Sequence, residues 1–129
     1  MEAYTLSASE TIIMKAIWDS NGKRISTCDL LAILREKYRK DYARTTVTTF
    51  LQKLSYKGFV RCNREGKFSY IESLIEEQEY VTKLMNGQID FWYDGKVADA
   101  VAVLIEKQKD KNEDLTPIIR LLEEKVNSK

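Results

Sequence analysis

The sequence contains no histidine, only two cysteines and one proline in 129 residues. Without histidine the chain lacks the commonest general base and the commonest transition-metal ligand. Two isolated cysteines, Cys28 and Cys62, form neither a disulfide framework nor a convincing zinc site. A glycine-rich phosphate loop, a G-x-S-x-G motif and an H-E-x-x-H motif are also missing. We therefore expect no enzyme activity, no catalytic residue, no metal site and no cofactor.

Long hydrophobic runs are absent as well. No apolar stretch approaches the ~20 residues that a transmembrane helix requires. The opening stretch MEAYTLSASE lacks the basic start and apolar block of a signal peptide. Scarce cysteine is typical of a reducing compartment, and 43% apolar residues are enough for a packed core. We expect a folded cytoplasmic protein that does not insert into a membrane.

Charge is unevenly distributed along the chain. Residues 1–71 contain 13 Lys and Arg against 7 Asp and Glu, a net charge of +6. Residues 72–129 contain 8 Lys and Arg against 13 Asp and Glu, a net charge of −5. A basic part joined to an acidic part favours a polyanionic partner for the first part alone. A chance imbalance is the alternative, because each excess amounts to a few charges.

Helix and strand signals alternate over the first part of the chain. Ser7 and Glu10 form a capping box, which predicts a helix that ends near residues 20–22. A short strand is expected at 23–25, followed by a second helix that ends within the charged run 35–44. A solvated helix end accounts for most of the charges in that run.

The third predicted helix, residues 44–56, has one apolar face and one hydroxyl-rich face. At 100° per residue, one arc holds the apolar residues Val47, Phe50, Leu51 and Leu54. The opposite side holds Thr45, Thr46, Thr48, Thr49, Gln52 and Lys53. β-Branched threonine is a mediocre helix former, so an exposed threonine face points to a function. The alternative is that Thr45 or Thr46 caps the helix and the other threonines are neutral.

A β-hairpin is predicted after the third helix. Its strands are expected at 59–62 and 67–71, joined by a turn at Asn63–Gly66. Gly58 suits the left-handed position that ends the preceding helix. Cys62, on the first strand, is expected to be buried as a small hydrophobe. Three cations on or near the turn can contact a DNA backbone: Arg61, Arg64 and Lys67.

The predicted elements follow in the order helix, short strand, helix, helix and hairpin. This is the order of a winged helix-turn-helix, in which the third helix enters the DNA major groove. We predict a mainly α fold with a small β wing, as a winged-helix DNA-binding domain at 1–72 and a C-terminal helical dimerisation region at 73–129. Threonine hydroxyls and methyls can contact phosphates, base edges and thymine methyls. The expected DNA-binding residues are Arg44, Thr45, Thr46, Thr48, Thr49, Gln52, Lys53, Arg61, Arg64 and Lys67.

Three further helices are expected after residue 73, with breaks at 93–95 and 107–114. A region of ~55 residues is of marginal size for forming an independent hydrophobic core. Their apolar stripes must therefore pack on the winged helix or on a second copy, and a homodimer uses them best. The expected dimer interface comprises Leu84, Phe91, Trp92, Val97, Val101, Leu104, Ile118, Leu121 and Leu122. An intrachain core is the alternative for the aromatic run 91–93.

Two stretches match the pattern of a known family. Residues 6–18, LSASETIIMKAIW, look like the opening helix of the penicillinase repressor (BlaI/MecI) family of winged-helix transcriptional repressors. Residues 45–80, TTVTTFLQKLSYKGFVRCNREGKFSYIESLIEEQEY, resemble its recognition helix, lysine-glycine turn, wing and acidic helix start. The resemblance implies a homodimeric repressor of a palindromic operator, released by proteolysis through a membrane-bound β-lactam sensor. It places the dimer helices at roughly 73–127.

Three features depart from that family's pattern. The recognition helix has Thr45 and Thr48 where Lys or Arg is frequent, and Ala43-Arg44 where the usual start is Ser-Pro. The operator sequence therefore does not transfer. The family's Asn-Phe cleavage site corresponds to Val103-Leu104, which argues against cleavage by that route. The segment LLEEKVNSK has no cysteine, which disfavours the copper sensing of the related CopY-like repressors.

The expected partners are double-stranded operator DNA, a second copy of the chain and a membrane sensor protease. Two other functions stay open at the level of the sequence. Low basicity in the recognition helix also fits a winged-helix protein-interaction module without DNA affinity. The aromatic cluster near Trp92 also fits a ligand-responsive regulator, whose tryptophan fluorescence would change on ligand addition.

Overall fold

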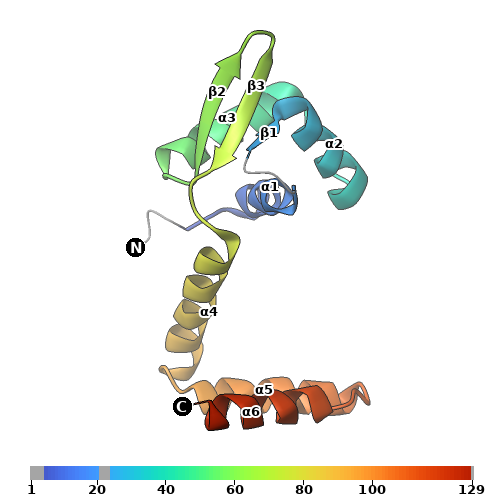
Figure 1. Cartoon of the computed structure of the whole chain (residues 1–129), viewed down its shortest axis with the longest axis vertical. Helices are drawn as coiled ribbons and strands as arrows, with labels where there is room; N and C mark the ends of the chain where they lie inside the picture. The colour runs from blue at the N-terminus through green and yellow to red at the C-terminus, as the bar shows by residue number, and fades with distance from the viewer. Residues whose placement is uncertain (1–4, 21–23, 129) are drawn as a thin grey trace. The chain divides into compact units, whose positions relative to one another are not determined.

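The computed structural model describes residues 5–20 and 24–128, and the chain forms two compact units, residues 1–81 and 82–129 (Figure 1). Asn21, Gly22 and Lys23, at which a helix stop and a strand start are predicted, lie outside the described residues. Across those described ranges, none of the helices combines the length and apolar character that a bilayer crossing requires.

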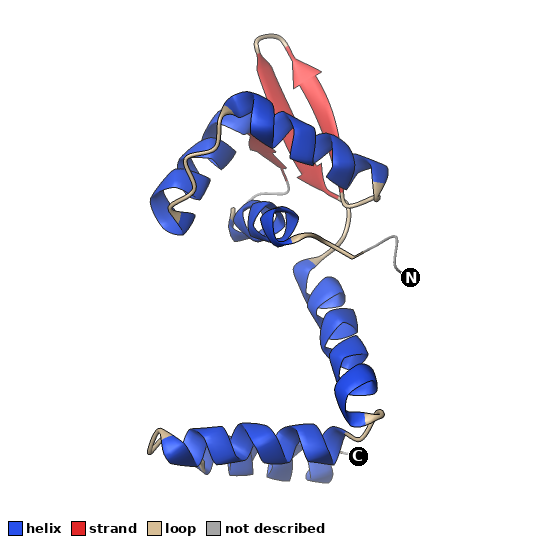
Figure 2. Ribbon diagram, turned by 180° about the vertical axis from the view of Figure 1, so that it is seen from behind, coloured by secondary structure: helices blue, strands red, loops and turns tan. Residues whose placement is uncertain are grey.

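The first unit has the predicted order of elements. It contains α1 (Ala8–Asp19), β1 (Arg24–Ser26), α2 (Thr27–Tyr38), α3 (Arg44–Tyr56), β2 (Val60–Glu65), β3 (Phe68–Ser73) and the first turn of α4 (Glu77–Tyr93). The strands form an antiparallel sheet in the order β1-β3-β2. Helix α3 lies across one face of the β2–β3 hairpin, and the hairpin turn projects beyond it (Figures 1 and 2). This arrangement confirms the winged helix-turn-helix prediction.

Local capping explains where the helices begin and end. Ser7 Oγ accepts a hydrogen bond from the Glu10 backbone N–H at 3.2 Å, and the Ser7 N–H donates to the Glu10 carboxylate at 2.8 Å. The predicted capping box is therefore confirmed. Helix α2 ends at Tyr38, and its C-cap residue Arg39 has a left-handed φ of 57°. Gly58 follows α3 with a φ of 85°, the backbone conformation predicted for it.

The hairpin turn is tighter than predicted. The expected turn at Asn63–Gly66 is wrong, because β2 continues through Glu65 and β3 begins at Phe68. Glu65 pairs with Phe68, which leaves a two-residue turn. Gly66 occupies its first position with a φ of 62°, and two-residue turns match the twist of paired strands when glycine supplies this conformation. The wing is consequently longer and carries its turn further from the core.

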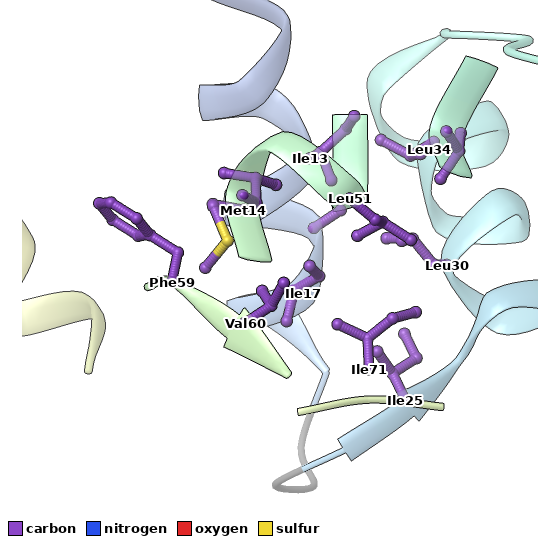
Figure 3. Close-up of a cluster of buried hydrophobic side chains, with 13 residues drawn as sticks. Ile13, Met14, Ile17, Ile25, Leu30, Leu34, Leu51, Phe59, Val60 and Ile71 are labelled. Atoms are coloured by element: carbon purple, nitrogen blue, oxygen red, sulfur yellow. The ribbon is translucent and has the colours of Figure 1, made fainter. Parts of the chain in front are cut away.

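The core of the first unit draws side chains from every helix and strand (Figure 3). Helices α1, α2 and α3 contribute Ile13, Met14, Ala16, Ile17, Leu30, Leu34, Val47, Leu51 and Leu54, and the sheet region contributes Ile25, Phe59, Val60 and Ile71. Because the inner faces of α2 and α3 both enter this cluster, their mutual orientation is fixed by packing. That packing sets which side of α3 faces outward.

One buried ion pair joins the first helix to the end of the third. The Glu10 residue is 2% exposed, and Lys57 Nζ donates to its carboxylate at 2.7 Å. Burial by itself would raise the pKa of Glu10, but hydrogen bonds from Lys57 and from the Ser7 N–H, with the Lys57 charge, hold that pKa below its ordinary value. The pair ties the C-terminal end of α3 to the start of α1.

Protonation of Glu10 should destabilise the protein in acid. A carboxyl with a lowered folded-state pKa contributes stability above its unfolded pKa, and this stability is lost as the pH falls through the folded pKa. The unfolded value for glutamate is about 4.3. Urea unfolding of wild type and Glu10→Gln should differ by about 1.5–3 kcal/mol near neutral pH, and the difference should shrink steadily below about pH 4.3. A difference that persists undiminished in acid would contradict this role of the carboxylate.

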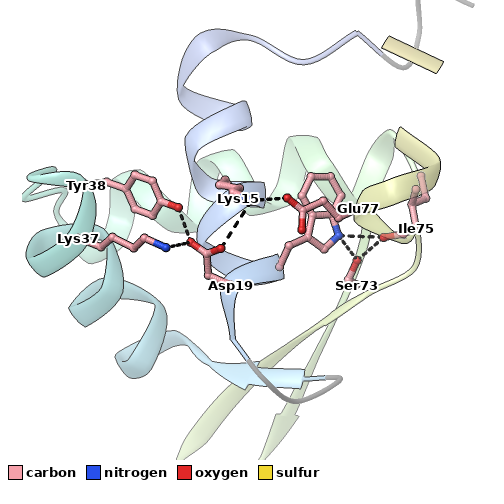
Figure 4. A network of polar contacts seen from close by, with 8 residues as sticks. Lys15, Asp19, Lys37, Tyr38, Ser73, Ile75 and Glu77 are labelled. Atoms are coloured by element: carbon pink, nitrogen blue, oxygen red, sulfur yellow. Dashed lines mark hydrogen bonds and ion pairs between the residues drawn. The ribbon is translucent and has the colours of Figure 1, made fainter. Parts of the chain in front are cut away.

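The first turn of α4 is packed onto the winged helix (Figure 4). Trp18 Nε1 donates to Ser73 Oγ at 3.0 Å and to the Ile75 carbonyl at 2.9 Å. The Tyr80 ring lies 5.7 Å from the Trp18 ring and 5.5 Å from the Phe59 ring, measured between centroids. These contacts explain why the first compact unit extends to residue 81, and the functional division at 72/73 stays a prediction.

The second unit consists of the rest of α4 with α5 (Val97–Asp110) and α6 (Thr116–Asn127). Among its described residues, 82–128, Ala100 alone is buried. Its exposed large apolar side chains are Leu84, Met85, Phe91, Trp92, Val97, Val103, Leu104, Ile119, Leu121, Leu122 and Val126. Three helices with so little buried apolar surface lack the core that an isolated unit of this size needs.

Candidate nucleic-acid interface

Helix α3 presents its polar face to solvent. Val47 and Leu54 are fully buried and Leu51 is 5% exposed, so the opposite face is turned outward. Of the predicted contact residues on this helix, Thr46 is half-buried and the others are exposed: Arg44, Thr45, Thr48, Thr49, Gln52 and Lys53. The structure therefore brings the predicted recognition residues together on one open surface.

The threonines of α3 do not cap it. The N-cap position is Ala43, and no side chain bonds to the cap, so the capping alternative for Thr45 or Thr46 is wrong. Thr48 Oγ1 donates to the Arg44 carbonyl at 3.0 Å, and Thr49 Oγ1 donates to the Thr45 carbonyl at 3.1 Å. With its proton engaged, each hydroxyl oxygen still has acceptor capacity. Donation to a phosphate would require the hydroxyl to leave its backbone partner.

A groove lies between α3 and the sheet. It has a volume of about 360 Å³. From α3 it is lined by Arg44, Thr48, Leu51, Gln52 and Ser55, and from the rest of the unit by Thr27, Cys62, Ser69, Tyr70 and Ile71. Most of the lining residues have a polar side chain, Leu51 and Ile71 add apolar surface, and Arg44 is the single charged residue of the lining.

The strand register separates the three cations of the wing. Residues directly opposite each other in an antiparallel pair share one face of the sheet. Arg64 pairs with Ser69, two residues from the Cys62–Ile71 pair, so Arg64 lies on the face that carries buried Ile71 and the groove. Arg61 instead pairs with Glu72 on the opposite face. Its guanidinium hydrogen-bonds the Glu72 carboxylate at 3.3 Å.

Ion pairing sorts the cations of the first unit into two groups. The cations held by carboxylates are Lys15, Arg24, Lys37, Lys57 and Arg61. Within residues 5–20 and 24–81, seven cations have no ion pair: Arg35, Arg39, Lys40, Arg44, Lys53, Arg64 and Lys67. The first three lie at the C-terminal end of α2, and the other four lie on α3 or near the hairpin turn. The predicted site therefore contains four cations whose charge no carboxylate compensates.

Cys62 is exposed, and the expectation that it would be buried is wrong. It shares the inner sheet face with Ile71, but it lines the open groove rather than the core. Partial burial in the groove nevertheless raises the pKa of its thiol. Cys28 lies at the start of α2, where its sulfur is 3.6 Å from the Arg44 guanidinium. Neither cysteine forms a disulfide.

Several polar residues near α3 were not predicted from the sequence. Thr27, Ser55, Ser69 and Tyr70 line the groove. Tyr56, at the end of α3, is 94% exposed. The helical periodicity could have identified Tyr56, because it follows Thr45, Thr49 and Gln52 along the outward face. Ser69 and Thr27 depend on strand pairing and helix packing, which the sequence pattern does not specify.

The predicted dimer-interface residues lie in the second unit, and most are exposed. Val101 and Ile118 are half-buried, while Leu84, Phe91, Trp92, Val97, Leu104, Leu121 and Leu122 are exposed. The Phe91 and Trp92 rings meet edge to face at 4.8 Å between centroids. Trp92 Nε1 donates to the Gln88 side chain at 2.8 Å. The intrachain-core alternative is therefore wrong for Phe91 and Trp92, which are 74% and 67% exposed.

Comparisons with known proteins agree with this arrangement. A sequence model of the penicillinase repressor family matches residues 6–124. The penicillinase repressor of Bacillus licheniformis is 24% identical over 124 residues, which cover 96% of this chain and 94% of that protein. The methicillin resistance regulatory protein MecI of Staphylococcus aureus is also 24% identical over 124 residues, covering 96% of this chain and 98% of MecI. The solution structure of the DNA-binding domain of the repressor BlaI matches with 26% identity and a TM-score of 0.50, covering 60% of this chain and 90% of that domain.

Proposed function

Since the chain belongs to the penicillinase repressor family, we propose that it is a homodimeric, non-enzymatic, cytoplasmic transcriptional repressor that binds a palindromic operator in double-stranded DNA. The observation that carries the proposal is the exposed polar face of α3, which stands beside four cations without carboxylate partners. A merely solvated helix surface would not require threonine at successive outward positions.

The proposed DNA contacts divide by chemistry. Base contacts specify sequence, and phosphate contacts position the protein. The contacts proposed on α3 are Arg44, Thr45, Thr46, Thr48, Thr49, Gln52 and Lys53. From the wing, Arg64 and Lys67 contact the DNA backbone. Arg61 is expected to contribute less to DNA binding, because its charge is already paired with the Glu72 carboxylate.

The second unit supports a dimer. Its apolar side chains are exposed along all three helices, and a second copy of the chain can bury them. Two winged helices joined in this way would place two recognition helices at successive half-sites, about one helical turn apart. The proposed interface therefore comprises the exposed apolar residues of α4, α5 and α6.

A membrane sensor protease is a further proposed partner. The position that corresponds to the family's cleavage site, Val103-Leu104, lies within α5, and these side chains are 52% and 61% exposed. A peptide bond inside a helix becomes available only after local unfolding. Release by this route would therefore require α5 to open.

Two alanine variants test the proposed DNA contacts by their different signatures. Thr49→Ala should reduce the ratio between operator and non-operator affinity by roughly 5–150-fold, because a lost base contact costs about 1–3 kcal/mol of discrimination. Arg64→Ala should weaken all sequences about equally and lower the log–log salt slope by about one. Fluorescence anisotropy with operator and scrambled duplexes measures both quantities. Equal effects of Thr49→Ala on both duplexes would remove Thr49 from the base-contacting set.

A further inference from the structure

Resting on the proposed function, we propose that the segment from the end of β3 to the first turn of α4 is an anchor that sets the half-site spacing to which a dimer can bind. The α4 anchor comprises Ser73, Leu74, Ile75, Glu77 and Tyr80, which all belong to the first unit. A winged helix joined to the dimer helices by a flexible linker would tolerate many half-site spacings. A fixed connection selects one spacing, so the geometry of the operator contributes to recognition together with its sequence.

The connection between β3 and α4 is short and held by hydrogen bonds. Three residues lie between the end of β3 and the start of α4. The Leu74 N–H donates to the Phe59 carbonyl at 2.8 Å. The Ile75 carbonyl accepts from Trp18 Nε1 at 2.9 Å and from Ser73 Oγ at 2.7 Å. The connection therefore lacks the conformational freedom of a flexible linker.

Aromatic packing holds the first turn of α4 itself. The Tyr80 ring contacts both the Trp18 ring of α1 and the Phe59 ring, and Phe59 is a core residue. Aromatic pairs at these distances stabilise a contact beyond the area that they bury. Leu84, the first proposed dimer residue of α4, follows Tyr80 by four residues, which is about one helical turn. The anchored turn and the start of the proposed dimer interface therefore belong to the same helix.

A network of ion pairs extends the anchor to the helix-turn-helix (Figure 4). Lys15 of α1 pairs with the Glu77 carboxylate of α4 and lies 3.7 Å from the Asp19 carboxylate. Asp19 also accepts hydrogen bonds from Lys37 Nζ at 2.7 Å and from the Tyr38 hydroxyl, both at the end of α2. Positive and negative groups thus alternate from α4 to α2. The network links the position of the first turn of α4 to the first helix of the helix-turn-helix.

Operator duplexes with altered half-site spacing test the anchor. Two base pairs inserted between the half-sites move one half-site by about 7 Å along the DNA axis and rotate it by about 70°. Wild-type protein should bind this duplex about tenfold or more weakly than the native operator, because avidity is lost when geometry prevents both half-sites from being engaged. This ratio of affinities is the spacing penalty. A duplex with a single half-site measures binding by the winged helix without the dimer geometry.

Tyr80→Ala should release the first turn of α4. The substitution removes both aromatic contacts of the anchor and replaces no residue of α1, α3 or the sheet. The spacing penalty should fall to about threefold or less, whereas the affinity for the single half-site should stay within about twofold of wild type. Fluorescence anisotropy titrations of the full-length chain measure both quantities. A circular dichroism melt establishes that the variant is folded under the assay conditions.

Glu77→Gln is a second variant, which removes the ion pair of the anchor. The Lys15 and Glu77 side chains are 47% and 35% exposed, and ion pairs this exposed add little to stability. The loss of this pair should lower the spacing penalty by about twofold or more. Glu76→Gln is the matched control, because it removes the same charge at an exposed position that has no ion pair within residues 5–20 and 24–128. The control should keep the wild-type spacing penalty.

The outcomes separate this proposal from the proposed function. A reduced spacing penalty with unchanged binding to the single half-site supports the anchor. A folded Tyr80→Ala protein that keeps the wild-type penalty overturns it, and where Tyr80→Ala does not fold, the same result for Glu77→Gln overturns it. Equal losses of affinity for all duplexes would also overturn it, because they would show an effect on the winged helix alone. A wild type that binds all spacings alike overturns the anchor and leaves DNA binding intact, whereas absence of operator binding by wild type would contradict the proposed function.

Discussion

Leu121→Glu should convert the proposed dimer to a monomer and lower its operator affinity by about 100-fold or more. Leu121 and its neighbour Leu122 are 52% and 53% exposed on α6 within the isolated chain. In a dimer they would be buried, and a carboxylate placed there would lose its hydration without a partner. The loss of affinity follows because each operator half-site would then bind a separate chain.

Sedimentation velocity and an operator titration on the same preparations measure this effect. Asn127→Glu is the matched control, since it adds the same charge near the end of the same helix at an exposed polar position. The control should stay dimeric and bind operator like wild type. A Leu121→Glu protein that remains dimeric, or a monomeric one that binds operator undiminished, would contradict the assignment of this face to the dimer.

Phe59→Ala should lower the free energy of unfolding by about 3–5 kcal/mol. Phe59 is 1% exposed and lies where three elements meet. Its backbone N–H donates to the Leu54 carbonyl of α3 at 2.9 Å, and its carbonyl accepts from the Leu74 N–H at 2.8 Å. Its ring packs edge to face on Tyr80 of α4. Truncation would leave a cavity at the point where α3, the wing and the first turn of α4 are joined.

Urea unfolding monitored by circular dichroism measures this loss. Phe68→Ala is the control, because it removes the same type of side chain from β3 at a position that is 52% exposed. An exposed substitution of this kind typically changes stability by less than about 0.5 kcal/mol. Similar losses for the two variants would show that Phe59 is not a central packing residue.

The helices of the first unit could be predicted closely because their signals are local. The capping box at Ser7 and Glu10, the apolar arc of α3 and the glycine at position 58 each act within a few residues. The hairpin turn was misplaced because Asn63 and Glu65 are poor strand formers. Pairing with β3 along the full length of β2 outweighs that local preference.

The finer features of the site could not be predicted from the sequence because they depend on contacts between distant residues. Arg24 and Glu65 are 41 residues apart, yet they form two hydrogen bonds of 2.7 and 2.9 Å. The pairing of Arg61 with Glu72 follows from strand register, which periodicity alone does not determine. For the same reason the sequence indicated three equivalent wing cations, whereas the structure leaves Arg64 and Lys67 without a carboxylate partner among the described residues.

The central claim is that two copies of this chain bind one duplex through α3 and the wing. Its most direct test is an anisotropy titration of the full-length protein against its own upstream DNA over a series of salt concentrations. The account predicts saturation at two chains per duplex, with log affinity falling linearly against log salt by about 0.9 per phosphate neutralised. Binding that is absent, or that does not change with salt, would contradict it.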